Sequence, residues 1–142
     1  MRRALTLPVL CLAVWIPSCA DGEVATRGRL LDREGDVQLE LAITIADTEH
    51  TRQEGLRLHG PLGDGEALLL VFPNEGTVCI TNAGVPFPID VVFVSSSGLV
   101  AAVEPHIPAD APGPFCHPHT AMALELPWDT LRPLNYWKLE LF

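Results

Sequence analysis

Basic side chains are scarce in this sequence of 142 residues, which has nine Lys and Arg against 18 Asp and Glu. The formal net charge of −9 argues against a nucleic-acid partner, because binding a phosphate backbone needs a basic face. Several motifs that mark catalytic or nucleotide-binding sites are also missing, namely Gly-x-Ser-x-Gly, His-Glu-x-x-His, a paired CxxC and a phosphate-cradling Gly-rich loop. These absences favour a non-enzymatic role, and we expect no cofactor.

The first apolar run, residues 5–16, follows a basic start and is too short to cross a bilayer as a mature helix. The next residues, Ile16-Pro17-Ser18-Cys19, resemble the lipobox of a bacterial lipoprotein. We therefore predict a lipoprotein-type signal peptide over residues 1–18 and lipidation of Cys19. The alternative is an ordinary secretory signal with an incidental cysteine. Either interpretation predicts export. With the lipid, the protein is held at the membrane of the bacterial envelope and faces the periplasm or the exterior.

Removal of residues 1–18 takes away two arginines and leaves a formal charge of −11 (−9 − 2). The segment that follows is small, polar and charged, and it shows no periodicity. We predict a flexible tether over residues 19–36 and a single β-rich domain over residues 37–142.

The clearest secondary-structure signal is the alternation of apolar and polar residues over 37–46, which predicts a half-buried strand. A short helix is expected next over residues 48–54, with a threonine at its start and Gly55 at its end. Leu56 and Leu58 are then expected to carry the chain back to the core.

The middle of the chain reads as short strands closed by Pro, Gly, Asn or Ser. In two of its runs, ALLLVF and IDVVFV, apolar residues occupy both the odd and the even positions, so that both faces of the strand would be apolar. This predicts strands in the middle of a packed sheet. The four strands expected here cover residues 67–72, 77–81, 88–94 and 99–104.

A proline-rich passage over residues 105–118 is predicted to be a long ordered loop, because five of its residues are proline. Two more strands are expected, at residues 121–126 and 135–142. The fold class is therefore all-β, a compact β-sandwich or small barrel of about seven strands with one short helix.

Several segments, taken in order, resemble one known family. They are ADTEHTRQEGL, LLLVF, TNAGVPFPIDVVFVSSSGLV, the late Cys116, and LEL at residues 124–126. The family is the bacterial and archaeal domain of unknown function 192, many of whose members are exported or lipid-anchored. The resemblance covers essentially everything from Val37 onward. It implies a compact β-rich domain and no established chemistry.

The chain departs from this family at two places. Arg57 stands where the family usually has Met after Gly-Leu, and VCITNA at residues 78–83 replaces a run of an aromatic residue followed by Trp-Met-Lys-Asn-Thr. From that region this chain keeps Asn82 and, further on, Asp90. One interpretation is therefore that this chain is a degenerate member of the family, which has lost the family's activity and is retained for a structural role.

Two cysteines, Cys79 and Cys116, remain after export and acylation, and in an exported protein such a pair favours a disulfide. Closing a loop of about 38 residues stabilises the fold by about 4 kcal/mol in the chain-entropy model. One alternative is a Zn²⁺ or copper site, or a metal-dependent enzyme, built from Cys79, Cys116, His117 and His119, with His106 as a further ligand. The other alternative is that both cysteines are free thiols.

Asp90 stands in an apolar strand and needs a partner. It is expected to cap turn amides around Asn82, and the alternative is a general base beside Asn82 or His106. The leading functional hypothesis is a binding or accessory module that recognises a small ligand, an envelope polymer or an envelope protein. The predicted ligand loops hold Asn82, Asp90, His106, His117 and His119.

Overall fold

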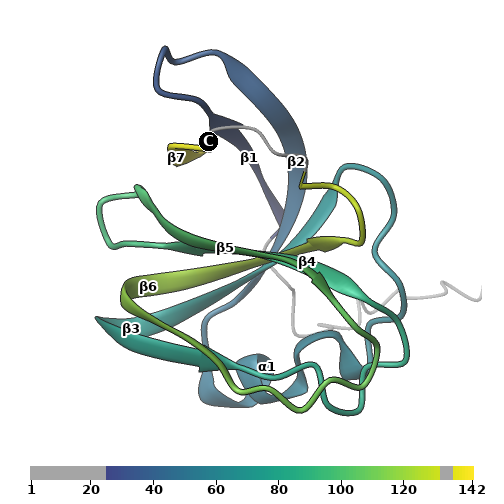
Figure 1. Ribbon diagram of the computed structural model, residues 1–142. Coiled ribbons are helices and arrows are strands. Elements are labelled where there is room, and N and C mark those ends of the chain that lie inside the picture. Colours follow the sequence, from purple (N-terminus) through teal and green to yellow (C-terminus); the bar gives the residue numbers. More distant parts are fainter. Residues whose placement is uncertain (1–24, 132–135) are drawn as a thin grey trace, which may run out of the picture.

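A computed structural model describes residues 25–131 and 136–142, in which seven strands form one mixed sheet with a short helix beside it (Figure 1). The spatial order of the strands is β5-β4-β6-β3-β2-β1-β7, and the pair β2/β3 is parallel. The strands are β1 (Ala25–Leu31), β2 (Val37–Ala46), β3 (Glu66–Ile80), β4 (Ile89–Val94), β5 (Val100–Ile107), β6 (Phe115–Pro127) and β7 (Lys138–Leu141). The helix α1 (Glu49–Glu54) runs directly into a 3₁₀ turn, η1 (Gly55–Arg57).

The sheet curls into a half-barrel whose two edges meet at one point. Leu99, just before β5, forms an antiparallel bridge with Lys138 of β7. The amide of Val100 donates to the carbonyl of Trp137 at 2.9 Å, and the amide of Leu139 donates to the carbonyl of Gly98 at 2.8 Å. The predicted all-β fold with one short helix is confirmed, in its barrel form.

Each face of the sheet carries its own core. The concave face gathers side chains from both ends of the sheet, including Leu30, Leu69, Val92 and Leu124. The opposite face packs against η1 and three loops, and its buried residues include Leu56 of η1. β4 is buried along its whole length, with its apolar residues divided between the two cores. The two runs with apolar residues at both odd and even positions are therefore buried inside the sheet, with side chains in both cores, as predicted.

β3 is one strand where the sequence predicted two. The predicted strands over residues 67–72 and 77–81 both overlap it, and the residues between them contain Pro73 and Gly76. The register against β6 shifts between Val71 and Gly76, and residues 73–77 are exposed. The proline and glycine mark an irregularity inside a strand, which such residues allow, and they do not form a turn.

β1 corrects the predicted tether, because residues 25–31 pair with β2 on one side and β7 on the other. The folded domain therefore begins by Ala25 and not at Val37. Gly28 lets the strands pack closely, since a Cβ there would lie 3.0 Å from the carbonyl oxygen of Glu140 and 2.5 Å from Cδ1 of Ile43 and would force these neighbours to move. The number of strands is still seven because β1 is added while two predicted strands merge into β3.

Half of the proline-rich passage is strand, which also corrects the prediction. β5 continues through Pro105 to Ile107, and β6 begins at Phe115, so that the loop is residues 108–114. β5 is an edge strand in which a missing N–H is tolerated, and Pro118 falls near the point where the register of β6 against β3 shifts.

The helix α1 and its ends agree with the prediction, with Thr48 as N-cap and Gly55 as C-cap. Leu56 is buried, as expected, whereas Leu58 is 80% exposed and does not return to the core. The predicted last strand is shortened to β7, and Asn135 lies outside the described residues. In the described part of the chain, no helix is long and apolar enough to span a membrane.

Candidate functional site

A cavity of about 300 Å³ lies between α1–η1 and the outer face of the sheet. Its walls are apolar and come from η1, β3 and the turn that follows β3. Charged side chains of α1 and η1 stand around it, and one carboxyl group, Glu125, reaches it from the sheet. The apolar lining residues are Leu56, Leu70, Phe72, Ile80 and Val85.

Glu125 enters the cavity because of the alternation of β6. Its neighbours Leu124 and Leu126 belong to the core on the concave face, whereas Ala123 belongs to the core beneath α1. Successive side chains of a strand point to opposite faces, so Glu125 shares the face of Ala123. Its partners across the sheet are Leu68 on β3 and Val91 on β4, both buried and apolar.

The carboxyl group of Glu125 is buried, and one of its two oxygens has no hydrogen-bond partner among the described residues. The residue is 5% exposed, and its Oε2 atom makes no hydrogen bond to any residue that the structure describes. Burial raises the pKa of Glu125 to about 7, and the positive charge of Arg57 offsets part of that rise. A buried, unpaired acid is costly to a fold, so its presence here calls for an explanation beyond packing.

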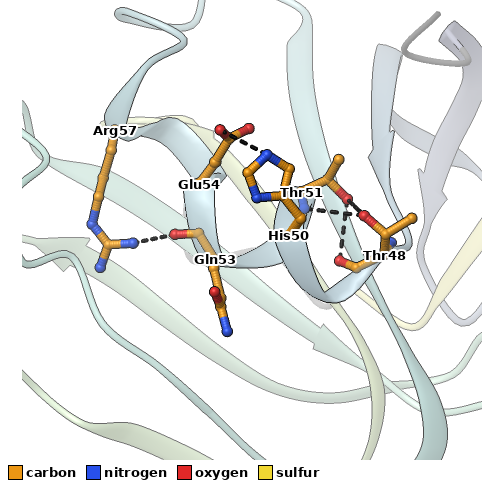
Figure 2. Close-up of polar contacts among 6 residues, drawn as sticks. All are labelled: Thr48, His50, Thr51, Gln53, Glu54 and Arg57. Carbon is orange, nitrogen blue, oxygen red and sulfur yellow. Dashed lines mark hydrogen bonds and ion pairs between the residues drawn. The ribbon is translucent and has the colours of Figure 1, made fainter. Parts of the chain in front are cut away.

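The roof of the cavity, α1, is held mainly by polar contacts, and none of its residues is buried. Thr48 and Thr51 form a capping box, each side-chain oxygen accepting from the backbone amide of the other at 3.1 Å (Figure 2). His50 lies 3.1 Å from Glu54 one turn later. Figure 2 also shows Arg57 reaching back from η1 to the carbonyl of Gln53.

Two arginines tie this roof to the sheet. Nη1 of Arg52 donates to the carbonyl of Asp47 at 2.6 Å and to that of Val71, in β3, at 2.8 Å. Nε of Arg57 donates to the carbonyl of Ala83 at 3.0 Å, in the turn after β3. The cavity therefore has a roof that is fixed at both ends by guanidinium–carbonyl bonds.

The predicted cysteine pair lies at the edge of the same cavity. Cys79 on β3 and Cys116 on β6 are direct cross-strand neighbours, with 4.0 Å between their Cα atoms, and a disulfide joins them. Both residues are exposed, and Cys79 contributes to the cavity lining. The bridge links the end of β3 to the beginning of β6.

The ligand set of the metal hypothesis is not brought together. The two cysteines are bonded to each other, Nε2 of His117 lies 2.8 Å from Glu104, and His119 is exposed. Within residues 25–131 and 136–142, no group of three or more His, Cys, Asp or Glu side chains is arranged to hold a metal ion.

Asn82 and Asp90 each hold loops in place through hydrogen bonds to the backbone. Asn82 is 1% exposed, and its Nδ2 donates to the carbonyls of Phe87 at 3.1 Å and Pro108 at 2.8 Å. Asp90 is fully buried and accepts from two backbone amides, those of His106 and Leu131, each at 2.8 Å.

Asp90 is therefore a capping residue, as expected, but its partners differ from the predicted ones. The amide of Gly84 is capped by Asp110 at 2.8 Å instead. His106 is exposed, and its ring lies 5.7 Å from that of Trp128, whereas His117 pairs with Glu104. The predicted ligand residues therefore do not form one site, and Cys19 lies outside the described residues.

The sequence analysis missed Glu125, although one signal was available. It is the one charged residue in the run AMALEL of an expected strand, where a buried carboxyl group needs the same explanation as Asp90. Arg57 was noted as a departure from the family pattern, but its position beside Glu125 depends on η1, which the sequence did not predict.

Comparison with known proteins places this arrangement in a family. Residues 30–136 match the model of DUF192, whose members are described as uncharacterised. No protein with a curated description matches the chain.

Two crystal structures show the same fold. One, of a candidate transcription regulator from Sinorhizobium meliloti 1021, has a TM-score of 0.77 at 20% identity and covers 84% of this chain and 95% of its own. The other, of a protein of unknown function from Novosphingobium aromaticivorans DSM 12444, has a TM-score of 0.71 at 18% identity, with 82% and 84% covered. The family match extends over three quarters of the chain, and the chain therefore belongs to the DUF192 family.

Proposed function

We propose that this protein is an exported, lipid-anchored module of the bacterial envelope that binds a small ligand in the cavity beneath α1, without catalysing a reaction. The observation that carries the proposal is the carboxyl group of Glu125, which lies at the cavity, is buried, and leaves Oε2 without a hydrogen bond among the described residues. A ligand that donates a hydrogen bond to this oxygen would supply the partner that the described residues do not provide.

The shape and chemistry of the cavity support a small ligand. Its volume of about 300 Å³ is at the lower end of the range of about 300–1,000 Å³ that is usual for ligand sites. Apolar walls with one buried polar group are the usual composition of such sites, in which the polar group fixes orientation. A hydrolytic mechanism would need a second catalytic group positioned beside Glu125. The charged side chain that acts on Glu125, Arg57, donates to backbone carbonyls and does not supply such a group.

The envelope location is supported by the sequence of the first nineteen residues, with a basic start, a short apolar run and Cys19 in the position of a lipidated cysteine. If Cys19 carries a lipid anchor, the protein should fractionate with membranes, and Cys19→Ser should release it from the membrane fraction. Metabolic labelling with a radioactive fatty acid tests this directly. Label on the unchanged chain and none on Cys19→Ser supports the anchor, and an unlabelled wild-type chain contradicts it.

Ligand binding is tested with a library of small neutral, cationic and anionic fragments, followed by ¹H–¹⁵N NMR. The proposal predicts that binding fragments shift the amide signals of Leu56, Ile80 and Val85, which line the cavity. The variant Glu125→Leu fills the polar end of the cavity with an apolar group and should abolish these shifts. Fragments that bind only elsewhere on the surface, or no binding at all, would contradict the proposal.

A further inference from the structure

We infer that the ligand of the cavity beneath α1 is a primary or secondary organic amine in its ammonium form, with a short apolar body, and that Glu125 binds the ammonium group. This inference rests on the proposed function and names the ligand class for the same site. It is drawn from the unpaired buried oxygen, the lining of the cavity and the charges around it.

The buried oxygen needs a hydrogen-bond donor. A carboxylate only accepts hydrogen bonds, and Oε2 of Glu125 accepts none from the described residues. An ammonium N–H supplies both the hydrogen bond and the opposite charge, and such charge-assisted bonds are roughly twice as strong as neutral ones. An alcohol would supply the hydrogen bond alone.

The other charged groups at the cavity do not replace the ligand. Arg57 directs its Nε and Nη1 donors to the carbonyls of Ala83 and Gln53. Arg52 directs Nη1 to two further carbonyls, on Asp47 and Val71. Among the described contacts, neither arginine forms a hydrogen bond or an ion pair with Oε2 of Glu125, although the charge of Arg57 acts on this carboxyl group at longer range.

The acidic groups at the rim discriminate against anions. Three carboxyl groups, those of Glu49, Glu54 and Glu125, line the cavity, against two guanidinium groups, those of Arg52 and Arg57, which donate to backbone carbonyls. A ligand carboxylate placed against Glu125 would create a pair of like charges in an apolar site, which is strongly unfavourable. The net charge of −9 adds a general attraction for cations.

The lining also selects among cations. Sites for quaternary ammonium groups are commonly cages of several aromatic rings, whereas this cavity is lined by one aromatic residue of the described chain, Phe72. A quaternary group also has no N–H to donate to Oε2. The apolar walls formed by Leu56, Leu70 and Val85 suit an alkyl or aryl body.

Binding of an ammonium ion should release a proton when Glu125 is protonated beforehand. The carboxyl proton passes to the solvent, and the resulting carboxylate pairs with the ammonium group, whose own charge is unchanged. With the pKa of Glu125 near 7, the deprotonated fraction falls about 90-fold between pH 8 and pH 5, and the affinity for the amine should fall by the same factor.

The test uses four probes that share a six-carbon chain and differ in the head group, n-hexylamine, hexan-1-ol, hexanoate and hexyltrimethylammonium. They are titrated by NMR into the mature chain from residue 19, with Cys19→Ser so that neither lipid nor detergent is present. Hexylamine is expected to bind best, to shift the cavity amides, and to weaken about 90-fold from pH 8 to pH 5. The variant Glu125→Gln should weaken hexylamine about ten- to hundredfold at pH 8 and remove the pH dependence.

Glu40→Gln serves as the matched control, because Glu40 is exposed on β2 and does not line the cavity. It should leave the affinity and its pH dependence unchanged. Tighter binding of hexan-1-ol or hexanoate in the cavity, or hexylamine binding equally at both pH values, would overturn the ammonium inference while the proposed site stands. Absence of cavity shifts with all four probes overturns the inference too, and the wider fragment screen then decides whether the proposed function fails with it.

Discussion

The buried carboxyl group of Glu125 should make the stability of this protein depend on pH in an unusual direction. Most paired carboxylates stabilise a fold above their pKa, whereas Glu125 is easier to protonate in the folded chain than in the unfolded one. Below pH 4.5 both states hold the proton and no penalty arises. As the pH rises toward 7, the unfolded chain releases the proton first, so folding becomes less favourable.

The size of the effect follows from the interval between the ordinary Glu value of 4.5 and the pKa of about 7 in the folded protein. At about 1.36 kcal/mol for each pH unit, the penalty reaches about 3 kcal/mol above pH 7 and then stays constant. This is a large fraction of the total stability of a small domain. The variant Glu125→Gln carries no titrating proton and should escape the pH-dependent penalty.

The assay is urea denaturation of the oxidised wild type and Glu125→Gln at pH 4, 6 and 8, with unfolding followed by circular dichroism. Relative to wild type, the free energy of unfolding of Glu125→Gln should rise by about 3 kcal/mol between pH 4 and pH 8. The side-chain amide that this substitution introduces costs the same at each pH and cancels from this difference. Glu40→Gln, which removes an exposed carboxylate, should stay close to wild type throughout. A constant offset between Glu125→Gln and wild type at all three pH values would refute the reasoning.

Three further predictions follow from other contacts. The double variant Cys79→Ser/Cys116→Ser should lose about 4 kcal/mol of unfolding free energy, because the bridge closes a loop across a separation of 37 residues; equal urea midpoints with and without the bridge would contradict this. Asp90→Asn leaves one of two buried backbone amides facing an NH₂ group and should lower the free energy of unfolding by about 2 kcal/mol in the same assay. An unchanged free energy of unfolding would show that these caps do not stabilise the fold. Thr48→Ala removes the side-chain N-cap of α1 and should cost about 1 kcal/mol, seen as faster hydrogen exchange of the Thr51 amide, which donates to the Thr48 hydroxyl oxygen. Thr48→Ser keeps the cap, and exchange as fast in Thr48→Ser as in Thr48→Ala would rule out the capping explanation.

The parts of the fold that follow local rules could be predicted. The alternation in β2 gives its length, and the threonine and glycine at the two ends of α1 give its bounds. The apolar runs identify β4 and the first half of β3 as strands that are buried on both faces of the sheet. Each of these signals depends on residues that are close in the sequence.

The parts that were missed depend on distant partners. β1 has few apolar side chains and is a strand because β2 and β7 pair with it on both sides. The prolines of β5 and β6 are tolerated because of an edge position and a register shift, which only the assembled sheet defines. Local propensity predicts neither the pairing of β1 with distant strands nor the positions in the sheet where proline is tolerated.

The candidate site was missed for a related reason. The sequence directed attention to the clustered histidines and cysteines, whereas the structure uses the cysteines for a bridge and leaves His119 exposed. Glu125 and Arg57 are far apart in the sequence and come together because η1 packs over the sheet beside β6. Arg57 places a positive charge near the buried acid and offsets part of the rise in its pKa.

The most direct test of the account is the titration of the Glu125 carboxyl group itself, followed by the ¹³C chemical shift of its Cδ atom with and without hexylamine. The account predicts a midpoint at about pH 7 in the free protein and a lower midpoint when the amine is bound. A midpoint at the ordinary value of 4.5 in the free protein, unchanged by the amine, would contradict it.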